Sequence, residues 1–175
     1  MTRVVLITGP PGIGKTAVAQ AVAERLQGTK ARLCGDVFLL AVTPFQANEE
    51  RRRFLRENIV SFTRNAIEHD YDWVILEFVI LEDEFINAFV DSLEKDRCGV
   101  CVVSLLADGE AYRARLRTKT EYLGVSKQGL QACDEWMGRV RRLKLAQAID
   151  TSTLSVEQTV ERVRLLAERI AEGPD

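Results

Sequence analysis

Apolar positions along the chain follow two periods in turn, and they predict strands that alternate with helices. Residues 4–8 form a short β-branched run that ends in a glycine-rich loop, and the apolar positions of 17–26 then recur at helical spacing. Further strands are predicted over 31–34, 73–76, 99–106 and 146–149. Further helices are predicted over 48–69, 81–95, 109–118 and 129–144, and after Ser155, which forms a capping-box pattern with Gln158.

This alternation predicts an α/β protein in which a five-stranded parallel sheet lies between two layers of helices. Ligands of such sheets bind at the carboxyl ends of the strands. The chain of 175 residues is long enough to bury one core, and no linker, repeat or low-complexity segment interrupts it. We therefore expect a single domain over residues 1–175.

Composition argues against several classes of partner. The formal net charge of -2 and the pI of about 5.6 give no global basic field, so neither a long nucleic acid nor an anionic membrane is expected as a partner. The start of the chain does not resemble a signal sequence, and no apolar run reaches the roughly 18 residues of a membrane span. We expect a cytoplasmic protein. The spacing of the four cysteines is not typical of a disulfide framework, and we interpret them as small buried residues.

The glycine-rich loop carries the strongest motif in the sequence. It reads Gly9-Pro10-Pro11-Gly12-Ile13-Gly14-Lys15-Thr16, which fits G-x-x-x-x-G-K-[ST] between a predicted strand and a predicted helix. In this motif backbone N–H groups and the helix N-terminus surround phosphates, the lysine adds charge, and the threonine hydroxyl binds magnesium. Pro10 and Pro11 have no N–H, so the donors must come from Gly12 to Ala17. The motif predicts binding of ATP and Mg²⁺ by Gly9 to Ala17, with Thr16 as a metal ligand.

Two families that share this loop fit the rest of the chain poorly. The loop resembles that of AAA+ ATPases, but those carry adjacent acidic residues at the end of the Walker B strand, where this chain has Leu76-Glu77-Phe78. A GTPase would show an Asn-Lys-x-Asp box, which the sequence lacks. The D-x-x-G match that starts at Asp96 precedes a predicted strand instead of following one.

The remaining pattern resembles the small-molecule and nucleotide kinases among P-loop proteins, and most closely the chloramphenicol phosphotransferase-like and tunicamycin-resistance-type ATP-binding proteins. The resemblance covers nearly the whole chain. Its motifs are the loop, Gly35-Asp36, Leu105-x-Ala107-x-x-Glu110 with Arg115-Leu116-x-x-Lys119, and Ile149-Asp150-Thr151-Ser152. It implies a three-layer α/β/α sandwich with the kinase-like strand order 2-3-1-4-5.

Two carboxylates take functional roles from this resemblance. Asp36 follows the second predicted strand, where the family has an aspartate that acts as base toward the acceptor hydroxyl. Its alternative is the N-cap of a short helix that begins at Val37. Glu77 ends the third strand, where it would hold a magnesium water or approach the acceptor. Related kinases often have Asp at this position, and the alternative for Glu77 is a solvated strand end.

Basic residues of the helix over 109–118 match the lid of the family. By resemblance Arg115 and Lys119 are the positions that clamp phosphates, within a small lid around 113–127. The second is ordinarily arginine, and lysine lacks the bidentate fork. Asp150, Thr151 and Ser152 match the segment that borders the adenine, often through backbone groups. The alternatives are a solvated basic face for the helix and an ordinary turn for 150–152.

We therefore interpret the chain as an ATP- and Mg²⁺-dependent phosphotransferase that moves the γ-phosphate to a hydroxyl of a small molecule, such as an antibiotic or another natural product. Lys15 and the loop would bind, Asp36 would activate the hydroxyl, and Arg115 would clamp the phosphates. Two alternatives stay open: a kinase of nucleosides, sugars or polynucleotide ends, and a P-loop ATPase switch without an acceptor. A monomer and a homodimer both fit the sequence.

Overall fold

A parallel sheet forms the centre of the molecule. The computed structural model describes residues 1–40, 49–93, 95, 96, 98–123 and 127–169, and it describes the backbone alone for 39, 40, 118–123 and 127–133. Within this part of the chain five parallel strands pair in the order β2-β3-β1-β4-β5. They are β1 (Arg3–Thr8), β2 (Lys30–Cys34), β3 (Trp73–Glu77), β4 (Gly99–Leu106) and β5 (Gln147–Asp150). The predicted fold class and strand order are confirmed.

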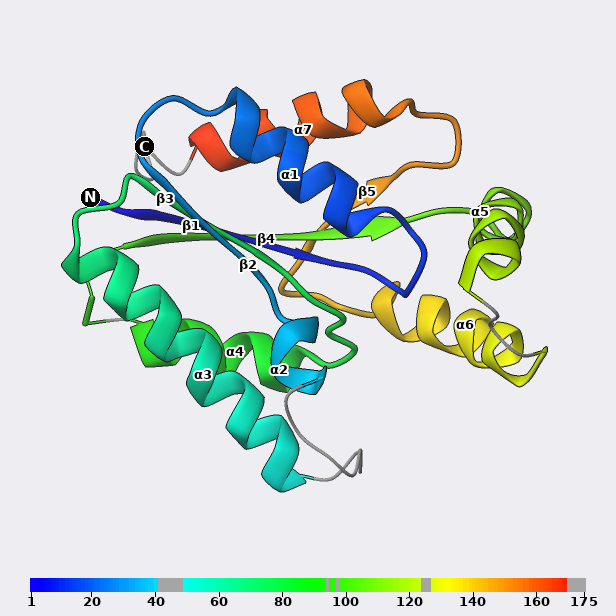
Figure 1. Cartoon of the computed structure of the whole chain (residues 1–175), viewed down its shortest axis with the longest axis horizontal. Helices are drawn as coiled ribbons and strands as arrows, with labels where there is room; N and C mark the ends of the chain where they lie inside the picture. The colour runs from blue at the N-terminus through cyan, green and yellow to red at the C-terminus, as the bar shows by residue number, and fades with distance from the viewer. Residues whose placement is uncertain (41–48, 94, 97, 124–126, 170–175) are drawn as a thin grey trace.

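Helices cover both faces of this sheet (Figure 1). One face packs against α1 (Lys15–Arg25) and α7 (Val156–Arg169), and the other against α3 (Glu49–Glu68) and α4 (Asp83–Leu93). The remaining helices, α2 (Asp36–Leu40), α5 (Gly109–Leu123) and α6 (Lys127–Val140), lie toward the edge at which the strands end. Both faces are apolar because each β-branched strand alternates its side chains between the two cores. None of the described helices combines the length and apolar character needed to cross a membrane.

The helices around the predicted lid differ in length from the prediction. α5 continues to Leu123, five residues beyond the predicted end at 118, and α6 ends at Val140 instead of 144. After α6 the N–H groups of Arg142 and Leu143 donate to the carbonyl oxygens three residues earlier, and the carboxylate of Asp83 then accepts hydrogen bonds from the backbone N–H groups of Lys144 and Leu145, at 3.0 Å each. Those groups are therefore used outside a helix. At α7 the predicted capping box is confirmed by reciprocal hydrogen bonds between Ser155 and Gln158.

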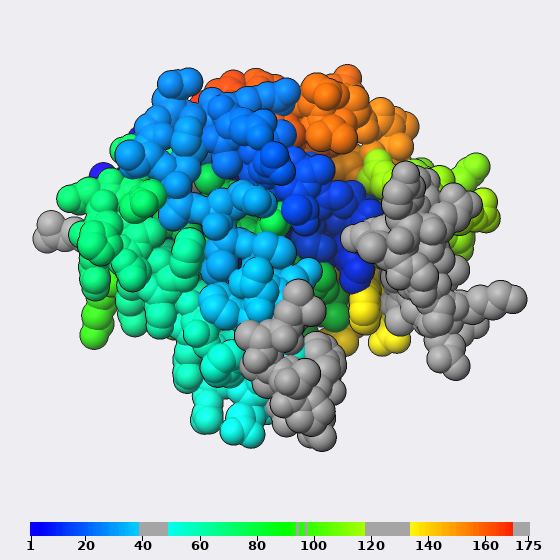
Figure 2. Space-filling model, in the orientation of Figure 1, coloured from blue at the N-terminus to red at the C-terminus, as the bar shows by residue number. Residues whose placement is uncertain are grey.

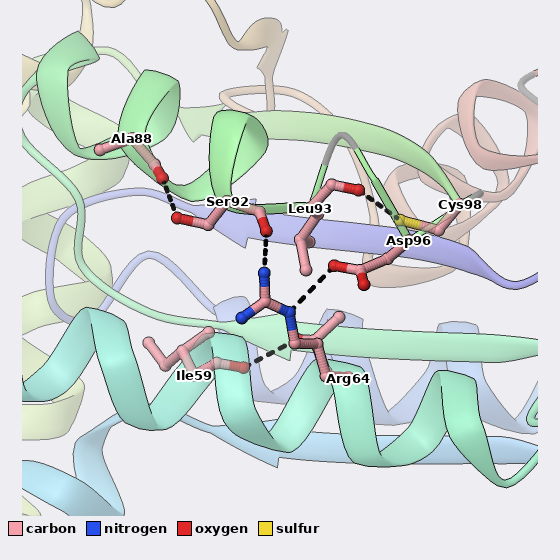
Figure 3. Close-up of polar contacts among 8 residues, drawn as sticks. Ile59, Arg64, Ala88, Ser92, Leu93, Asp96 and Cys98 are labelled. Atoms are coloured by element: carbon pink, nitrogen blue, oxygen red, sulfur yellow. Dashed lines mark hydrogen bonds and ion pairs between the residues drawn. The ribbon is translucent and has the colours of Figure 1, made fainter.

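On the side of the molecule away from the glycine loop, Arg64 of α3 links this helix to the end of α4 and the turn that follows it (Figure 3). Its Nε lies 3.0 Å from Asp96 Oδ2, and its Nη2 donates to the carbonyl oxygen of Ser92 at the end of α4. The thiol of Cys98 faces the carbonyl of Leu93 in the same turn. Asp96, which begins the D-x-x-G match, is thus engaged in joining two helices, far along the strands from the phosphate loop.

Candidate active site

Residues from four strands lie together at the edge of the sheet that the carboxyl ends of its strands form. The glycine loop follows β1, Asp36 follows β2, Glu77 ends β3 and Asp150 ends β5. The register aligns these ends, since Cys34 is beside Glu77 and Glu77 is beside Ile7. Figure 2 shows the dark blue surface of the glycine loop open on the face in view, between the lighter blue surface that follows it in sequence and the orange start of α7. This is the edge at which parallel sheets bind ligands.

The loop itself has the geometry of an anion site. Gly14 has φ of 110°, a left-handed conformation that favours glycine, and it precedes α1 without any side-chain cap. No acidic residue lies in the first turn of α1. The N–H groups of that turn and the positive end of the helix dipole are therefore directed at whatever lies in front of the loop. At the other end, a Cβ on Gly9 would lie 2.8 Å from the carbonyl oxygen of Leu105, so the loop fits only with glycine there.

Lys15 curves back over the loop that precedes it. Its Nζ donates to the carbonyl oxygens of Gly9 at 3.0 Å and Pro10 at 3.1 Å. The ammonium group thus lies above the concave side of the loop, where phosphate oxygens of a nucleotide would meet it. This agrees with the role predicted for Lys15, which stays a prediction.

Glu77 is a buried carboxylate, with only 2 % of its surface exposed, so the alternative of a solvated strand end is wrong. Its Oε1 accepts a hydrogen bond of 2.9 Å from Arg32 Nη1, while its buried Oε2 has no hydrogen-bond partner among the described residues. Burial raises the pKa of Glu77, and the charge of Arg32, the Thr16 hydroxyl, the Cys34 thiol and the charge of Lys15 oppose that rise. A buried carboxylate beside the first turn of α1 is unusual enough to indicate a function.

These residues fit a magnesium ion that is shared with phosphates. Magnesium in nucleotide sites takes one or two protein ligands and otherwise phosphate oxygens and water. Thr16 and Glu77 Oε2 are oxygen donors of this kind, and Lys15 balances the charge of the phosphates. In the described part of the chain no cluster of three or more His, Cys, Asp or Glu side chains is placed to hold a metal ion.

Asp36 is exposed and is the first residue of α2. Its backbone N–H lies close to the Cys34 thiol, whose pKa is raised by burial. The backbone N–H of Gly35 donates to the Glu77 carbonyl oxygen at 2.9 Å, which fixes the turn that carries Asp36 beside β3. The side chain therefore starts from the edge that the loop occupies and is accessible to an acceptor. Its place at the start of α2 is compatible with both a base and a helix cap.

Arg115 joins the nucleotide loop to the loop after β5. Its guanidinium donates to the Thr151 carbonyl oxygen at 2.6 Å, to Thr151 Oγ1 at 2.7 Å and, more weakly, to the carbonyl oxygen of Ile13 at 3.5 Å. One turn earlier in α5, the Tyr112 hydroxyl donates to the carbonyl oxygen of Pro11 at 2.8 Å. The described contacts show Arg115 organising the loop, and a direct phosphate contact stays a prediction.

The turn 150–152 is built by its own side chains. Thr151 bonds to the carbonyl oxygen of Leu106 through both its N–H and its hydroxyl, and Ser152 accepts from the N–H of Asp108 at 2.7 Å. Hydrogen bonds from Ser152 lower the pKa of Asp150. All three side chains are thus explained by their roles in the turn. The predicted contact with the adenine ring would therefore have to come from backbone groups.

Parts of the predicted site lie outside the described residues. The backbone of Lys119 belongs to α5, but its side chain is outside the described part of the chain, as are residues 124–126 of the predicted lid around 113–127. The structure adds two residues that the sequence analysis did not single out, Arg32 and Tyr112. Arg32 was detectable in principle, because it precedes Cys34 by two positions in a strand and so shares the face that ends beside Glu77.

Comparison with known proteins agrees with this geometry. A family model described as an AAA domain matches residues 4–143, which is most of the chain. The chain belongs to this family. Together with structural neighbours that include a tunicamycin resistance protein and a gluconokinase, this match confirms the resemblance to the P-loop small-molecule kinase group. The description shares its name with the AAA+ ATPases, whereas several structural neighbours are kinases. No curated protein matches the sequence.

Three solved structures illustrate the fold. The tunicamycin resistance protein of Deinococcus radiodurans has a TM-score of 0.71 at 17% identity, with 94% of each chain covered. A gluconokinase from Sinorhizobium meliloti 1021 has a TM-score of 0.71 at 17% identity, with 96% of this chain and 93% of that chain covered. A sugar kinase from Janibacter sp. HTCC2649 has a TM-score of 0.63 at 20% identity, with 98% and 95% covered. At these identities the likeness shows the fold alone.

Proposed function

We propose that the protein is a phosphotransferase that moves the γ-phosphate of ATP to a hydroxyl of a small molecule. The observation that carries the proposal is the alignment of three strand ends, which brings the glycine loop, Asp36 and Glu77 to one edge of the sheet. A switch without an acceptor needs the loop and a metal ligand, but it has no use for a second, exposed carboxylate at this edge. The names of the neighbours support the same class, since they include a gluconokinase and a sugar kinase.

Each residue then has a task in the reaction. The N–H groups from Gly12 to Ala17 and the ammonium of Lys15 would hold the phosphates and balance their charge. Thr16 and Glu77 would hold magnesium, which neutralises charge on the phosphates when it is bound. Asp36 would orient the acceptor hydroxyl and take its proton as the oxygen bonds to the γ-phosphorus, while the bond from that phosphorus to the bridging oxygen breaks and ADP leaves. Arg115 would keep the loop and the turn at Thr151 in place beside the nucleotide.

The acceptor is proposed as a small hydroxylated molecule of the kind that the neighbours name, and an antibiotic or another natural product is our candidate class. The protein has the acidic composition of one that does not bind long nucleic acids. We propose that it acts in the cytoplasm, where ATP and magnesium are abundant.

The test is a measurement of magnesium-dependent ATP consumption across hydroxylated antibiotics, sugars, nucleosides and oligonucleotide ends. We expect one class of acceptor to stimulate turnover and Asp36→Asn to reduce the stimulated rate at least about 100-fold, which is the low end of what a general base supplies. Nucleotide affinity should stay within about twofold in this variant, since Asp36 does not belong to the loop.

The matched control is Asp91→Asn, which removes a surface carboxylate on α4 that accepts a hydrogen bond from Asn87. It should behave as the unchanged protein. A slow hydrolysis that is indifferent to every acceptor and to Asp36→Asn would refute the proposed transfer and favour the ATPase switch.

A further inference from the structure

Arg32 is a charged residue of the site that the phosphate-loop motif does not explain. It lies in β2, the edge strand, and its side chain is 37% exposed, whereas the side chain of its partner Glu77 is 1% exposed. The two side chains come from neighbouring strands. In the register Arg32 lies beside Ile75 and Cys34 lies beside Glu77, so the arginine extends along the strand to reach the carboxylate from the open side of the sheet.

The bond that it makes is one-sided. Arg32 Nη1 holds Oε1 of Glu77 at 2.9 Å, and Oε2 of the same carboxylate is buried without a hydrogen-bond partner among the described residues. Leaving a buried charged oxygen unsatisfied costs about 1–3 kcal/mol or more. Native proteins retain such groups rarely, and each calls for an explanation such as a ligand site. The guanidinium has further donors, so the protein keeps Oε2 unpaired although a cation stands next to it.

The unpaired oxygen belongs to the side of the sheet that α1 covers. Thr16 and Lys15, in the first turn of α1, are among the groups that act on Glu77, together with Cys34. The hydrogen bond from Arg32 to one oxygen restricts the plane of the Glu77 carboxylate within this close-packed interior. Arg32 therefore sets the direction in which the second oxygen is presented.

We propose that Arg32 is a positioning residue of the phosphate site, which holds Oε1 of Glu77 so that Oε2 is presented to the metal ion that accompanies the nucleotide. The inference rests on the proposed function, because it assumes that the loop binds a nucleotide with magnesium. The effect of removing Arg32 on metal binding has opposite signs for a positioning residue and for a simple ion-pair partner. A cation that merely neutralises Glu77 competes with the metal, so its removal would strengthen metal binding, whereas removal of a positioning residue weakens it.

The test measures how strongly magnesium and ADP support each other's binding. Calorimetry gives the affinity for ADP with excess magnesium and with a chelator, and the ratio of the two is the coupling. We expect Arg32→Met to leave the affinity without magnesium within about twofold and to reduce the coupling at least about tenfold, the lower end of effects seen when partners of metal ligands are removed. Arg32→Lys keeps a donor without the planar fork and should restore part of the coupling.

Arg164→Met is the matched control, because Arg164 forms ion pairs with Glu161 and Glu168 within α7, away from the strand ends. Its coupling should equal that of the unchanged protein. Thermal melting checks that each variant is folded, and Arg32→Lys carries the test if Arg32→Met does not fold: a coupling lowered in Arg32→Lys supports the positioning role.

Three outcomes would overturn the inference. Full or increased coupling in Arg32→Met would show that Arg32 only balances the charge of Glu77. If Arg32→Met is unfolded, full coupling in Arg32→Lys would show the same. In both cases the proposed function would stand if the unchanged protein still couples ADP to magnesium. Absence of any coupling in the unchanged protein would overturn the proposed function and the inference together.

Discussion

Replacing Glu77 by glutamine should make the free protein more stable at alkaline pH. The substitution keeps the shape of the side chain but removes a charge that is 2 % exposed and half unsatisfied. Removing the charge at the unpaired position is worth about 1–3 kcal/mol, and the bond from Arg32 to a neutral acceptor is weaker by about 1 kcal/mol than the bond to a carboxylate. The balance is a gain of about 1 kcal/mol, or about 2–4 °C in melting temperature for a chain of this size.

The stability difference between Glu77→Gln and the unchanged protein should grow as pH rises. Burial raises the pKa of Glu77 in the folded state above its value of 4.5 in an unfolded chain, so the folded protein binds a proton that the unfolded chain releases. The contribution of Glu77 to stability is therefore fully present below the unfolded pKa and is lost as pH rises through the folded pKa. The advantage of Glu77→Gln should appear over that same rise and should shrink toward pH 5.

Melting curves between pH 5 and pH 8.5, recorded with a chelator, measure this difference. Glu161→Gln is the control, because hydrogen bonds from Arg164 lower the pKa of Glu161 below its ordinary value of 4.5. Its contribution is lost only below this pH range, so its difference should be flat between pH 5 and pH 8.5. A melting temperature for Glu77→Gln below that of the unchanged protein at pH 8 would show that the ion pair with Arg32 outweighs the unpaired oxygen. A difference that does not vary with pH would refute the titration argument.

Two further substitutions test the loop. Lys15→Ala should abolish nucleotide binding by calorimetry, because it removes the ammonium that lies over the loop. Lys30→Ala, which removes a hydrogen bond to the carbonyl oxygen of Leu26, is the control and should not abolish binding. Unchanged affinity in Lys15→Ala would refute the loop assignment. Arg115→Ala should lower turnover more than nucleotide affinity and destabilise the protein by about 1–2 kcal/mol, because three acceptors lose a partly exposed charged donor. Arg113→Ala, whose exposed partner is Asp134, is the control, and equal kinetics in both variants would make Arg115 a surface residue.

The sequence was sufficient for the fold because its signals are local and repeated. The three central strands, β3, β1 and β4, contain continuous apolar runs, and the longer helices have an apolar face at regular spacing, so the alternation and the parallel sheet follow. The strand order came from the family resemblance, which the structure and the family match confirm. Helix ends were less predictable, since the segment after α6 is held by the distant Asp83, which accepts from the backbone N–H groups of Lys144 and Leu145.

The candidate site was predictable only where a motif fixes it. The loop from Gly9 to Thr16 has a conformation that its own glycines and prolines dictate. The burial of Glu77 depends on the neighbouring strand and on α1, so the sequence left it undecided between a functional contact and a solvated end. The ion pair with Arg32 joins residues 45 positions apart, and the bond from Tyr112 to Pro11 joins residues 101 positions apart. Pairings of this kind depend on tertiary packing, which one sequence does not reveal.

The bonds from α5 to the phosphate loop have a consequence for how the molecule releases a nucleotide. Tyr112 and Arg115 lie one turn apart on one helix, and they hold the carbonyl oxygens of Pro11 and Ile13, on either side of Gly12. A tilt of the helix would therefore pull on the middle of the loop at two points, and a loop that rearranges around phosphates would pull equally on the helix. Loading and unloading of a nucleotide would therefore be coupled to the position of α5 through these two bonds.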